Sequence, residues 1–384
     1  MWLTASEALG RLGTKPQTLY ANVSRGRIRA KPDPADSRRS LYSAEDVERL
    51  ATRRAGRRST AAVAAEAISW GDPVLVSALT TFSGGRLYYR GIDAVELSQG
   101  ATLEEVATLL WDGPWALTSP SPAIAGPHAG TVFSLLAEQA ARAVPSYGRG
   151  PLALRTDAGA VLASLADALL GSGEGLLHLR LAARLGRPQA ADDLRRALVL
   201  LADHELNSST FAARVTVSTG ASLAAGALSG FAALSGPLHG EASAAVMALV
   251  ADIGTDASGA DQALREWLGE GRIVPGFGHR LYPLGDVRCA ALLSHIAVPP
   301  AYEAVRRAAE RLADEKPNVD FALAALTDRW DLPSKAPLTI FALARCVGWL
   351  AHMLEQAATG TLIRPRARYI GPQVGRPEPG IASC

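Results

Sequence analysis

Two glycine- and proline-containing loops each display a single histidine. The loops GPLHG and PGFGH contain His239 and His279, and each lies where segments typical of helix meet. Glycine lets the backbone approach a ligand closely, and proline fixes a turn. Asp320 follows in residues 316–320 (KPNVD), again in a loop that precedes a helical segment. Two imidazoles and one carboxylate displayed in this way predict a polar pocket in an otherwise alanine-rich chain.

The position of His239 suits a hydrogen-bond donor. It precedes residues 242–253, whose apolar periodicity predicts a helix. The partial positive charge at a helix N-terminus disfavours imidazolium, so the ring stays neutral and can donate to a carbonyl, as an enolising enzyme requires. The alternative is a loop histidine that caps the helix. Asp320 has a similar alternative, because Asp320 or Asn318 could be the N-cap of the helix predicted at residues 321–330.

Seven short motifs, in this order along the chain, resemble the citrate synthase family. The resemblance extends from about residue 71 to residue 384. Any one of the motifs is weak, but seven in register are hard to produce by accident. They are SALTTFSGGRLYYRGIDA (77–94), DHELNSSTFAARV (203–215), GPLHG (236–240), PGFGHRLYPLGDVR (275–288), KPNVD (316–320), FALAR (341–345) and IRPRARYIG (363–371).

The resemblance implies that acetyl-CoA, oxaloacetate and water give citrate and CoA. Asp320 would remove the methyl proton, His239 would stabilise the enol(ate), and His279 would polarise the ketone. A carboxylate near its reference pKa of about 3.9 is a weak base, so Asp320 would need desolvation. No metal and no cofactor are implied, and acetyl-CoA is a substrate. The implied substrate-binding residues are His204, Arg288, Phe341, Arg345 and Arg364.

Three of these residues illustrate the binding chemistry. Phe341 and Arg345 are four apart on a helix expected from about Pro337, so they share one face. Guanidinium offers a bidentate fork to a carboxylate; for Arg288 the alternative is a surface arginine. Arg364 matches an arginine that the family supplies from the neighbouring subunit, which implies a homodimer with a shared site.

The sequence also departs from the family pattern near the site. Glu241 and Ser243 replace a small or apolar residue and an asparagine after His239, and Pro283 replaces a basic residue near the coenzyme A phosphates. These departures leave the acyl preference open. A 2-methylcitrate synthase using propionyl-CoA is therefore one alternative, since one methylene is worth only about 1–3 kcal/mol of discrimination.

Composition and cysteine usage predict a cytoplasmic globular protein. Of the 384 residues, 48% are hydrophobic and 20% charged, which is ordinary for a chain with a large core. We find no apolar run long enough to span a bilayer, no signal-peptide pattern and no phosphate-binding P-loop. The three cysteines, Cys289, Cys346 and Cys384, form neither a metal-like spacing nor an even disulfide set.

Residues 1–58 predict a separate basic domain. They hold 13 Lys and Arg against 6 Asp and Glu, a net charge of +7, whereas the rest of the chain holds 26 against 31, a net charge of −5. Two short helices and a basic hairpin wing resemble a MerR/excisionase-like winged helix-turn-helix. A duplex DNA partner is one interpretation; a packing or dimer-contact domain is the other. The candidate DNA-binding residues are Lys15, Gln17, Thr18, Tyr20, Arg25, Arg27, Arg38 and Arg39.

The predicted fold is mainly α. After a linker at 59–72, residues 73–384 should form a citrate synthase-like body, with a large part (about 73–240 and 331–384) and a small part (about 241–330) that closes over the site. A further alternative from another class is a DNA-binding regulator whose synthase-like body senses an acyl-CoA or oxaloacetate.

Overall fold

The computed structural model describes residues 2–12, 19, 23, 28–33, 36–47, 75–116, 129–253, 257–270, 272–367 and 369. The chain divides into two compact units. One comprises Met1–Val76 and Arg366–Cys384, and the other comprises Ser77–Pro365. The predicted boundaries at residues 58 and 72 lie outside the described residues and stay predictions.

The N-terminal unit contains a three-stranded antiparallel sheet and a short helix. Strands β1 (Trp2–Leu3), β3 (Asp36–Ser43) and β2 (Ala30–Asp33) follow one another across the sheet in that order. Strands β2 and β3 form an antiparallel hairpin, so the predicted hairpin is confirmed. Helix α1 (Ala5–Leu12) lies between β1 and β2 in the chain.

Local capping explains where α1 begins. The Thr4 backbone N–H donates to Glu7 Oε2 over 2.8 Å, and the Glu7 N–H donates back to Thr4 Oγ1 over 3.4 Å, which forms a capping box. A separate cluster of buried apolar side chains holds the unit together: Leu3, Ala8, Leu12, Leu19, Ile28, Tyr42 and Val47.

Most of the candidate DNA-binding residues lie outside the described part of the chain. Arg38 and Arg39 belong to strand β3, but the description does not extend to their side chains. The others outside the described residues are Lys15, Gln17, Thr18, Tyr20, Arg25 and Arg27. Their proposed role stays a prediction.

The larger unit opens with a small antiparallel sheet. Strands β4 (Thr80–Ser83), β5 (Arg86–Tyr89) and β6 (Ile92–Asp93) pair in chain order. Gly84 and Gly85 connect β4 to β5 with φ of +56° and +77°, values that favour glycine and that a two-residue hairpin turn requires. This glycine pair therefore fixes the turn between the two strands.

The rest of the described unit is helical, as the sequence predicts. The earlier helices are α5 (Ala94–Leu97), α6 (Leu103–Trp111), α7 (Ala129–Arg142), α8 (Pro151–Leu170), α9 (Leu177–Arg184), η1 (Pro188–Ala190, a 3-10 turn) and α10 (Ala191–Leu201). The later ones are α11 (Ser208–Ser218), α12 (Leu223–Leu234), α13 (Ala242–Ile253), α14 (Ala257–Gly269), α15 (Val287–Leu293), α16 (Pro300–Ala313), α17 (Val319–Arg329) and α18 (Ala336–Thr359).

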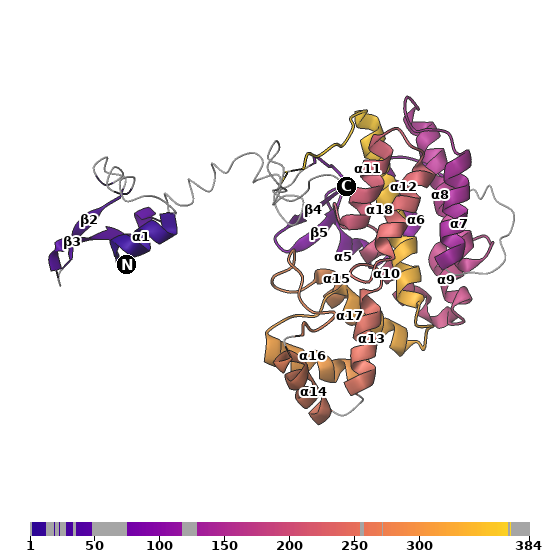
Figure 1. Ribbon diagram of the computed structural model, residues 1–384. Helices are drawn as coiled ribbons and strands as arrows, with labels where there is room; N and C mark the ends of the chain where they lie inside the picture. The colour runs from indigo at the N-terminus through magenta and orange to yellow at the C-terminus, as the bar shows by residue number, and fades with distance from the viewer. Residues whose placement is uncertain are drawn as a thin grey trace, which may run out of the picture. The chain divides into compact units, whose positions relative to one another are not determined.

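The helices of this unit form two groups (Figure 1). Helices α7, α8, α11, α12 and α18 pack on one another, whereas α13, α14, α16 and α17 gather at one end of the unit. Helix α15 packs against α17 of the second group and against α10, which packs on α18 of the first group. His239 lies in the loop that joins α12 of the first group to α13 of the second, His279 lies in the segment between α14 and α15, and Asp320 lies in the first turn of α17.

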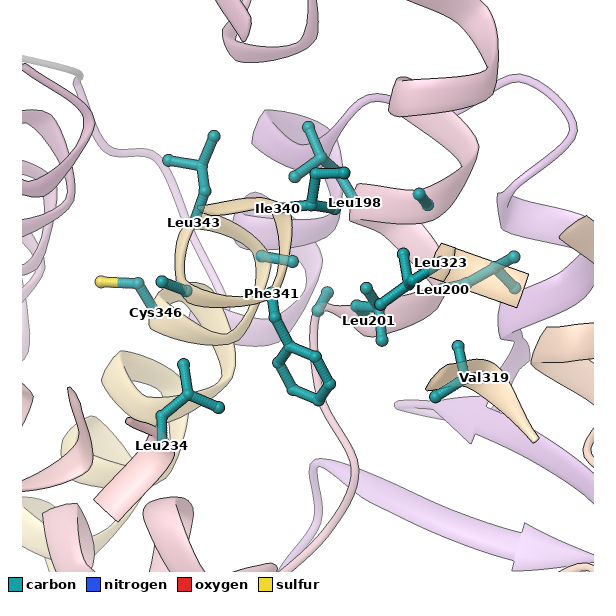
Figure 2. Packing of buried hydrophobic residues seen from close by; sticks show 14 of the residues in the cluster. Leu198, Leu200, Leu201, Leu234, Val319, Leu323, Ile340, Phe341, Leu343 and Cys346 are labelled. Atoms are coloured by element: carbon teal, nitrogen blue, oxygen red, sulfur yellow. The ribbon is translucent and has the colours of Figure 1, made fainter. Parts of the chain in front are cut away.

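Helix α18 is the central core helix. Its side chains Ile340, Phe341, Leu343 and Cys346 lie among apolar residues of other helices, such as Leu198 of α10 (Figure 2). By length and composition this helix would be able to cross a membrane, so the prediction that no apolar run reaches that length is wrong. Within the unit, 83% of its most apolar window is buried, as expected of a core helix in a globular protein.

Candidate active site

The structure brings seven of the eight predicted catalytic and substrate-binding residues into one region of the larger unit. The rings of His204 and His279 lie 5.2 Å apart, and those of His239 and Phe341 lie 5.7 Å apart. The Arg345 guanidinium carbon lies 4.8 Å from the Phe341 ring centroid, which confirms that these two residues share a face. Asp320 and Arg288 complete the group, because the charge of Arg288 affects the pKa of both Asp320 and His279.

A tight loop between α12 and α13 holds His239. The Gly240 N–H donates to Leu234 O over 2.8 Å, and a Cβ on Gly240 would lie 2.5 Å from the same oxygen. Only glycine therefore fits beside the histidine. Burial, followed by the charge of Arg345, lowers the pKa of His239 to about 4, so the ring is neutral at neutral pH, as predicted.

Ser209, in the first turn of α11, determines which nitrogen of His239 carries the proton. Its Oγ accepts from the Trp349 indole N–H over 3.1 Å, donates to Asn207 Oδ1 over 2.7 Å and lies 2.8 Å from His239 Nε2. A serine hydroxyl has one proton. While Asn207 receives that proton, the Nε2–H of His239 donates to Ser209 and the neutral ring has no second proton to donate. If the hydroxyl turns to Nε2, the ring proton lies on Nδ1, which can then donate to another group.

The loop that carries His279 is tied to residues 316–318, the loop that leads into α17 and Asp320. The Gly278 N–H donates to Lys316 O and the Asn318 N–H donates to Gly276 O, both over 2.8 Å. Gly276 has φ +80°, and a Cβ there would lie 2.5 Å from Val246 Cγ2. The two loops therefore set each other's position.

His279 is held as a neutral donor. Its Nδ1 accepts from the Leu281 N–H over 3.2 Å, which leaves the proton of the neutral ring on Nε2. Burial and then the charge of Arg288 lower the pKa of His279 to about 4. A neutral Nε2–H donor is the group that polarises a ketone without transferring a full proton.

Asp320 has the properties of a general base. The N-cap of α17 is Asn318, whose side chain accepts from the Asp320 N–H over 3.0 Å, so the Asp320 carboxylate does not serve as the cap. Desolvation raises the pKa of Asp320 to about 6, and the Ser243 hydroxyl, which donates to Oδ1 over 3.1 Å, acts in the opposite direction. A side chain that is half-buried stays accessible to a substrate.

The two buried arginines differ in how they are paired. Arg288 Nε and Nη2 donate to the two oxygens of Asp286 over 3.0 and 2.7 Å, so Arg288 is not a surface residue. Arg345 is 1% exposed, and its Nε donates to Leu201 O over 3.0 Å. Among the described residues, its buried Nη2 atom has no hydrogen-bond partner. A buried donor without an acceptor costs free energy, and the oxygen of an anionic ligand would supply that acceptor.

Comparison with known proteins decides the family. The citrate synthase C-terminal domain model matches residues 156–366. Putative citrate synthase 2 of Mycobacterium bovis is 34% identical over 335 residues, which cover 77% of this chain and 89% of that protein. The chain belongs to the citrate synthase family. The predicted citrate synthase-type enzyme is thereby confirmed, and citrate synthases need no cofactor.

Other members of the family are similar to this chain over a shorter range. Citrate synthase 2 of Bacillus subtilis is 40% identical over 195 residues, and 2-methylcitrate synthase 1 of Corynebacterium glutamicum is 35% identical over 199 residues. In these alignments the chain spans about half the length of each relative, 52% and 51%.

Solved citrate synthases share the fold. The Thermoplasma acidophilum enzyme, in a ternary complex with carboxymethyl coenzyme A and oxaloacetate, has a TM-score of 0.69 at 22% identity and covers 82% of this chain and 98% of its own. The Thermotoga maritima enzyme has a TM-score of 0.62 at 27% identity and covers 80% and 96%.

Arg364 is the one of the eight predicted site residues that the structure does not bring to the group. It lies beyond the end of α18 with an exposed side chain, and among the described residues no contact joins it to the three histidines. Its role stays a prediction about a second subunit.

The departures from the family pattern have distinct structural consequences. Glu241 is exposed, whereas Ser243 is buried and donates to Asp320. Pro283 lines a pocket of about 170 Å³ beside His279, where Lys316 is the basic residue among the carboxylates of Asp286, Asp314 and Glu315.

Within the described part of the chain, no group of three or more His, Cys, Asp or Glu side chains is arranged to hold a metal.

Sequence reasoning missed the residues that orient the site. Ser209 lies 30 residues before His239 and Ser243 lies 77 residues before Asp320, so neither contact follows from helical spacing. The DHELN segment was the available signal for Ser209, because it continues directly into the first turn of α11.

Proposed function

We propose that this protein condenses acetyl-CoA with oxaloacetate and water to give citrate and CoA. The observation that carries the proposal is the combination of Asp320, with a pKa of about 6, and two histidines with pKa values of about 4. At neutral pH the carboxylate is a base of raised strength, and both imidazoles are neutral donors. Enolisation of a thioester and attack on a ketone require this pairing.

In the first step Asp320 takes a proton from the methyl group of acetyl-CoA. The electron pair of the C–H bond moves toward the thioester carbonyl, and His239 stabilises the oxygen of the resulting enol(ate) by a hydrogen bond. The Ser209 hydroxyl would support this role by donating to His239 Nε2, because the ring proton then lies on Nδ1, the nitrogen left for the substrate.

In the second step the enol(ate) carbon attacks the ketone of oxaloacetate. His279 donates from Nε2 to the ketone oxygen as negative charge develops there. Arg288 and Arg345 would hold the substrate carboxylates, and His204 would contact the same substrate. Water then cleaves the thioester of the condensed product, which releases CoA and leaves citrate.

A thiol-release assay tests the proposal. Acetyl-CoA with oxaloacetate should release CoA, and omission of oxaloacetate should abolish the signal. Propionyl-CoA in parallel distinguishes a 2-methylcitrate synthase, an activity named for one relative at 35% identity. Absence of thiol release with any short acyl-CoA would contradict the proposal and would favour the sensor alternative.

We also propose that the enzyme is a homodimer whose sites are completed by Arg364 of the second subunit. Mixing Arg364→Ala with His279→Ala chains should restore activity, because a heterodimer then contains one site with both groups. About half of the wild-type activity per heterodimer is expected, since one of its two sites is intact, and about a quarter for a random equimolar mixture, in which about half of the dimers are heterodimers. Each variant alone is the control. Proven heterodimers that stay inactive would show that Arg364 acts elsewhere.

The basic residues 1–58 support a proposal of duplex DNA binding. Four or five phosphate contacts would give a log–log slope of affinity against salt of about −4. Fluorescence anisotropy over a salt series measures this slope, and Arg38→Ala/Arg39→Ala should make it shallower by about 2.

Deleting residues 1–58 should abolish DNA binding and change condensing activity by less than about threefold, a barrier change below about 1 kcal/mol. An affinity for DNA that does not change with salt concentration would contradict DNA binding through phosphate contacts and would favour a packing role for residues 1–58.

A further inference from the structure

Tyr282 lies at the centre of the residues proposed to bind oxaloacetate. It is 3% exposed. Its ring centroid lies 5.0 Å from that of His279 and 5.7 Å from that of His204, and the Arg288 guanidinium carbon lies 5.2 Å from it. One side chain therefore contacts three of the proposed substrate-binding or catalytic groups.

The backbone fixes Tyr282 independently of its side chain. The Tyr282 N–H donates to His279 O over 2.9 Å, and the Gly285 N–H donates to Tyr282 O over 3.0 Å. Two successive turns thus hold the residue between His279 and α15. Phe82 of β4 packs edge-on against the Tyr282 ring at 5.4 Å. The ring is therefore positioned by the loop and by packing, and its hydroxyl is not needed for placement.

The hydroxyl of Tyr282 faces His204. Tyr282 Oη lies 3.1 Å from His204 Nε2, and the tautomer of His204 decides which of the two atoms donates. A phenol can both donate its one proton and accept a hydrogen bond. Burial, followed by the charge of Arg288, lowers the pKa of His204 well below its ordinary value, so the ring is neutral. A neutral ring that accepts at Nε2 carries its proton on Nδ1.

We propose that Tyr282 is a positioning residue that holds His204 as an Nδ1–H donor for the dicarboxylate substrate. The inference rests on the proposed function, because it concerns how oxaloacetate is bound. The contact between Tyr282 and His204 joins two separate parts of the unit. Tyr282 belongs to the loop before α15, whereas His204 lies between α10 and α11. Substrate binding at His204 then depends on the loop that carries His279.

Tyr282→Phe removes the hydroxyl and keeps the ring. We expect the KM for oxaloacetate to rise about tenfold, about 1.4 kcal/mol. The KM for acetyl-CoA and kcat should change by less than about twofold. Tyr302→Phe is the matched control, because Tyr302 is also buried and packs edge-on against Phe321 at 5.6 Å. The control should leave all three constants unchanged.

A spectroscopic measurement keeps the two proposals distinguishable. The chain has 7 histidines, so long-range ¹H–¹⁵N spectra of the imidazoles, with His204→Gln for assignment, report each tautomer. Wild-type His204 should be protonated on Nδ1, and Tyr282→Phe should shift it toward Nε2. A wild-type ring protonated on Nε2, or an unchanged KM for oxaloacetate in an active Tyr282→Phe enzyme, would overturn the inference. Absence of thiol release by the wild type would overturn only the proposed function.

Discussion

Asp320→Asn is expected to lower kcat for condensation by at least about 100-fold, the lower end of what a general base contributes. The substitution preserves shape and removes the group that accepts the methyl proton. Oxaloacetate binding should be nearly unchanged, because the base acts on the other substrate. Steady-state kinetics with isothermal titration of oxaloacetate measures both quantities. Asp193→Asn is the matched control: this half-buried carboxylate of α10 accepts from the Trp330 indole N–H over 2.8 Å, outside the site.

The pH dependence of the wild type provides a second test of the same assignment. Desolvation raises the pKa of Asp320 to about 6, so the active form is the carboxylate. As the pH falls through 6 the base becomes protonated, and kcat should fall about tenfold per pH unit below that value. Retention of more than about a tenth of wild-type kcat by Asp320→Asn, a barrier change under about 1.4 kcal/mol, would rule out Asp320 as the base.

Arg345→Lys is expected to raise the KM for oxaloacetate by about 100-fold, equivalent to about 2.7 kcal/mol. Lysine keeps the positive charge but loses the planar fork that binds a carboxylate through two N–H groups. It also loses the Nε donor that Leu201 O accepts, so the ammonium is held less firmly. The buried Nη2 atom without a partner is the specific reason to expect a large effect on substrate binding.

Arg195→Lys is the control for that experiment. Arg195 is also buried, but its guanidinium is paired with Asp192 and with the carbonyl oxygens of Ser98 and Ala101. Its replacement should lower the melting temperature without changing the KM for oxaloacetate. Equal changes of KM in both variants would indicate that Arg345 supports the fold rather than the substrate.

Local signals in the sequence predicted several elements closely. The helix predicted at residues 242–253 has the observed bounds, and the helix expected from about Pro337 begins at Ala336, because apolar periodicity is encoded within a few residues. Helix α17 begins at Val319, two residues before the predicted start, because Asn318 rather than Asp320 is its N-cap. The capping residue matters for function, since it leaves the Asp320 carboxylate for other chemistry.

Long-range contacts explain what the sequence did not predict. Arg288 and Asp286 are close in the sequence, so their ion pair is a local contact. The burial of that ion pair, however, depends on how α15 packs against α10 and α17. The partners of the histidines, Ser209 and Tyr282, lie 30 and 78 residues from His239 and His204. Spacing along one helix carries no information about such contacts, because they arise only when separate loops meet.

The formation of a carbon–carbon bond tests the central claim most directly. Acetyl-CoA labelled with ¹³C in its methyl group is incubated with the intact protein and oxaloacetate, and the products are followed by ¹³C NMR. We predict citrate labelled in one methylene carbon, together with one equivalent of free CoA. Labelled acetate without labelled citrate, or unchanged acetyl-CoA, would contradict a citrate synthase-type condensation by this chain.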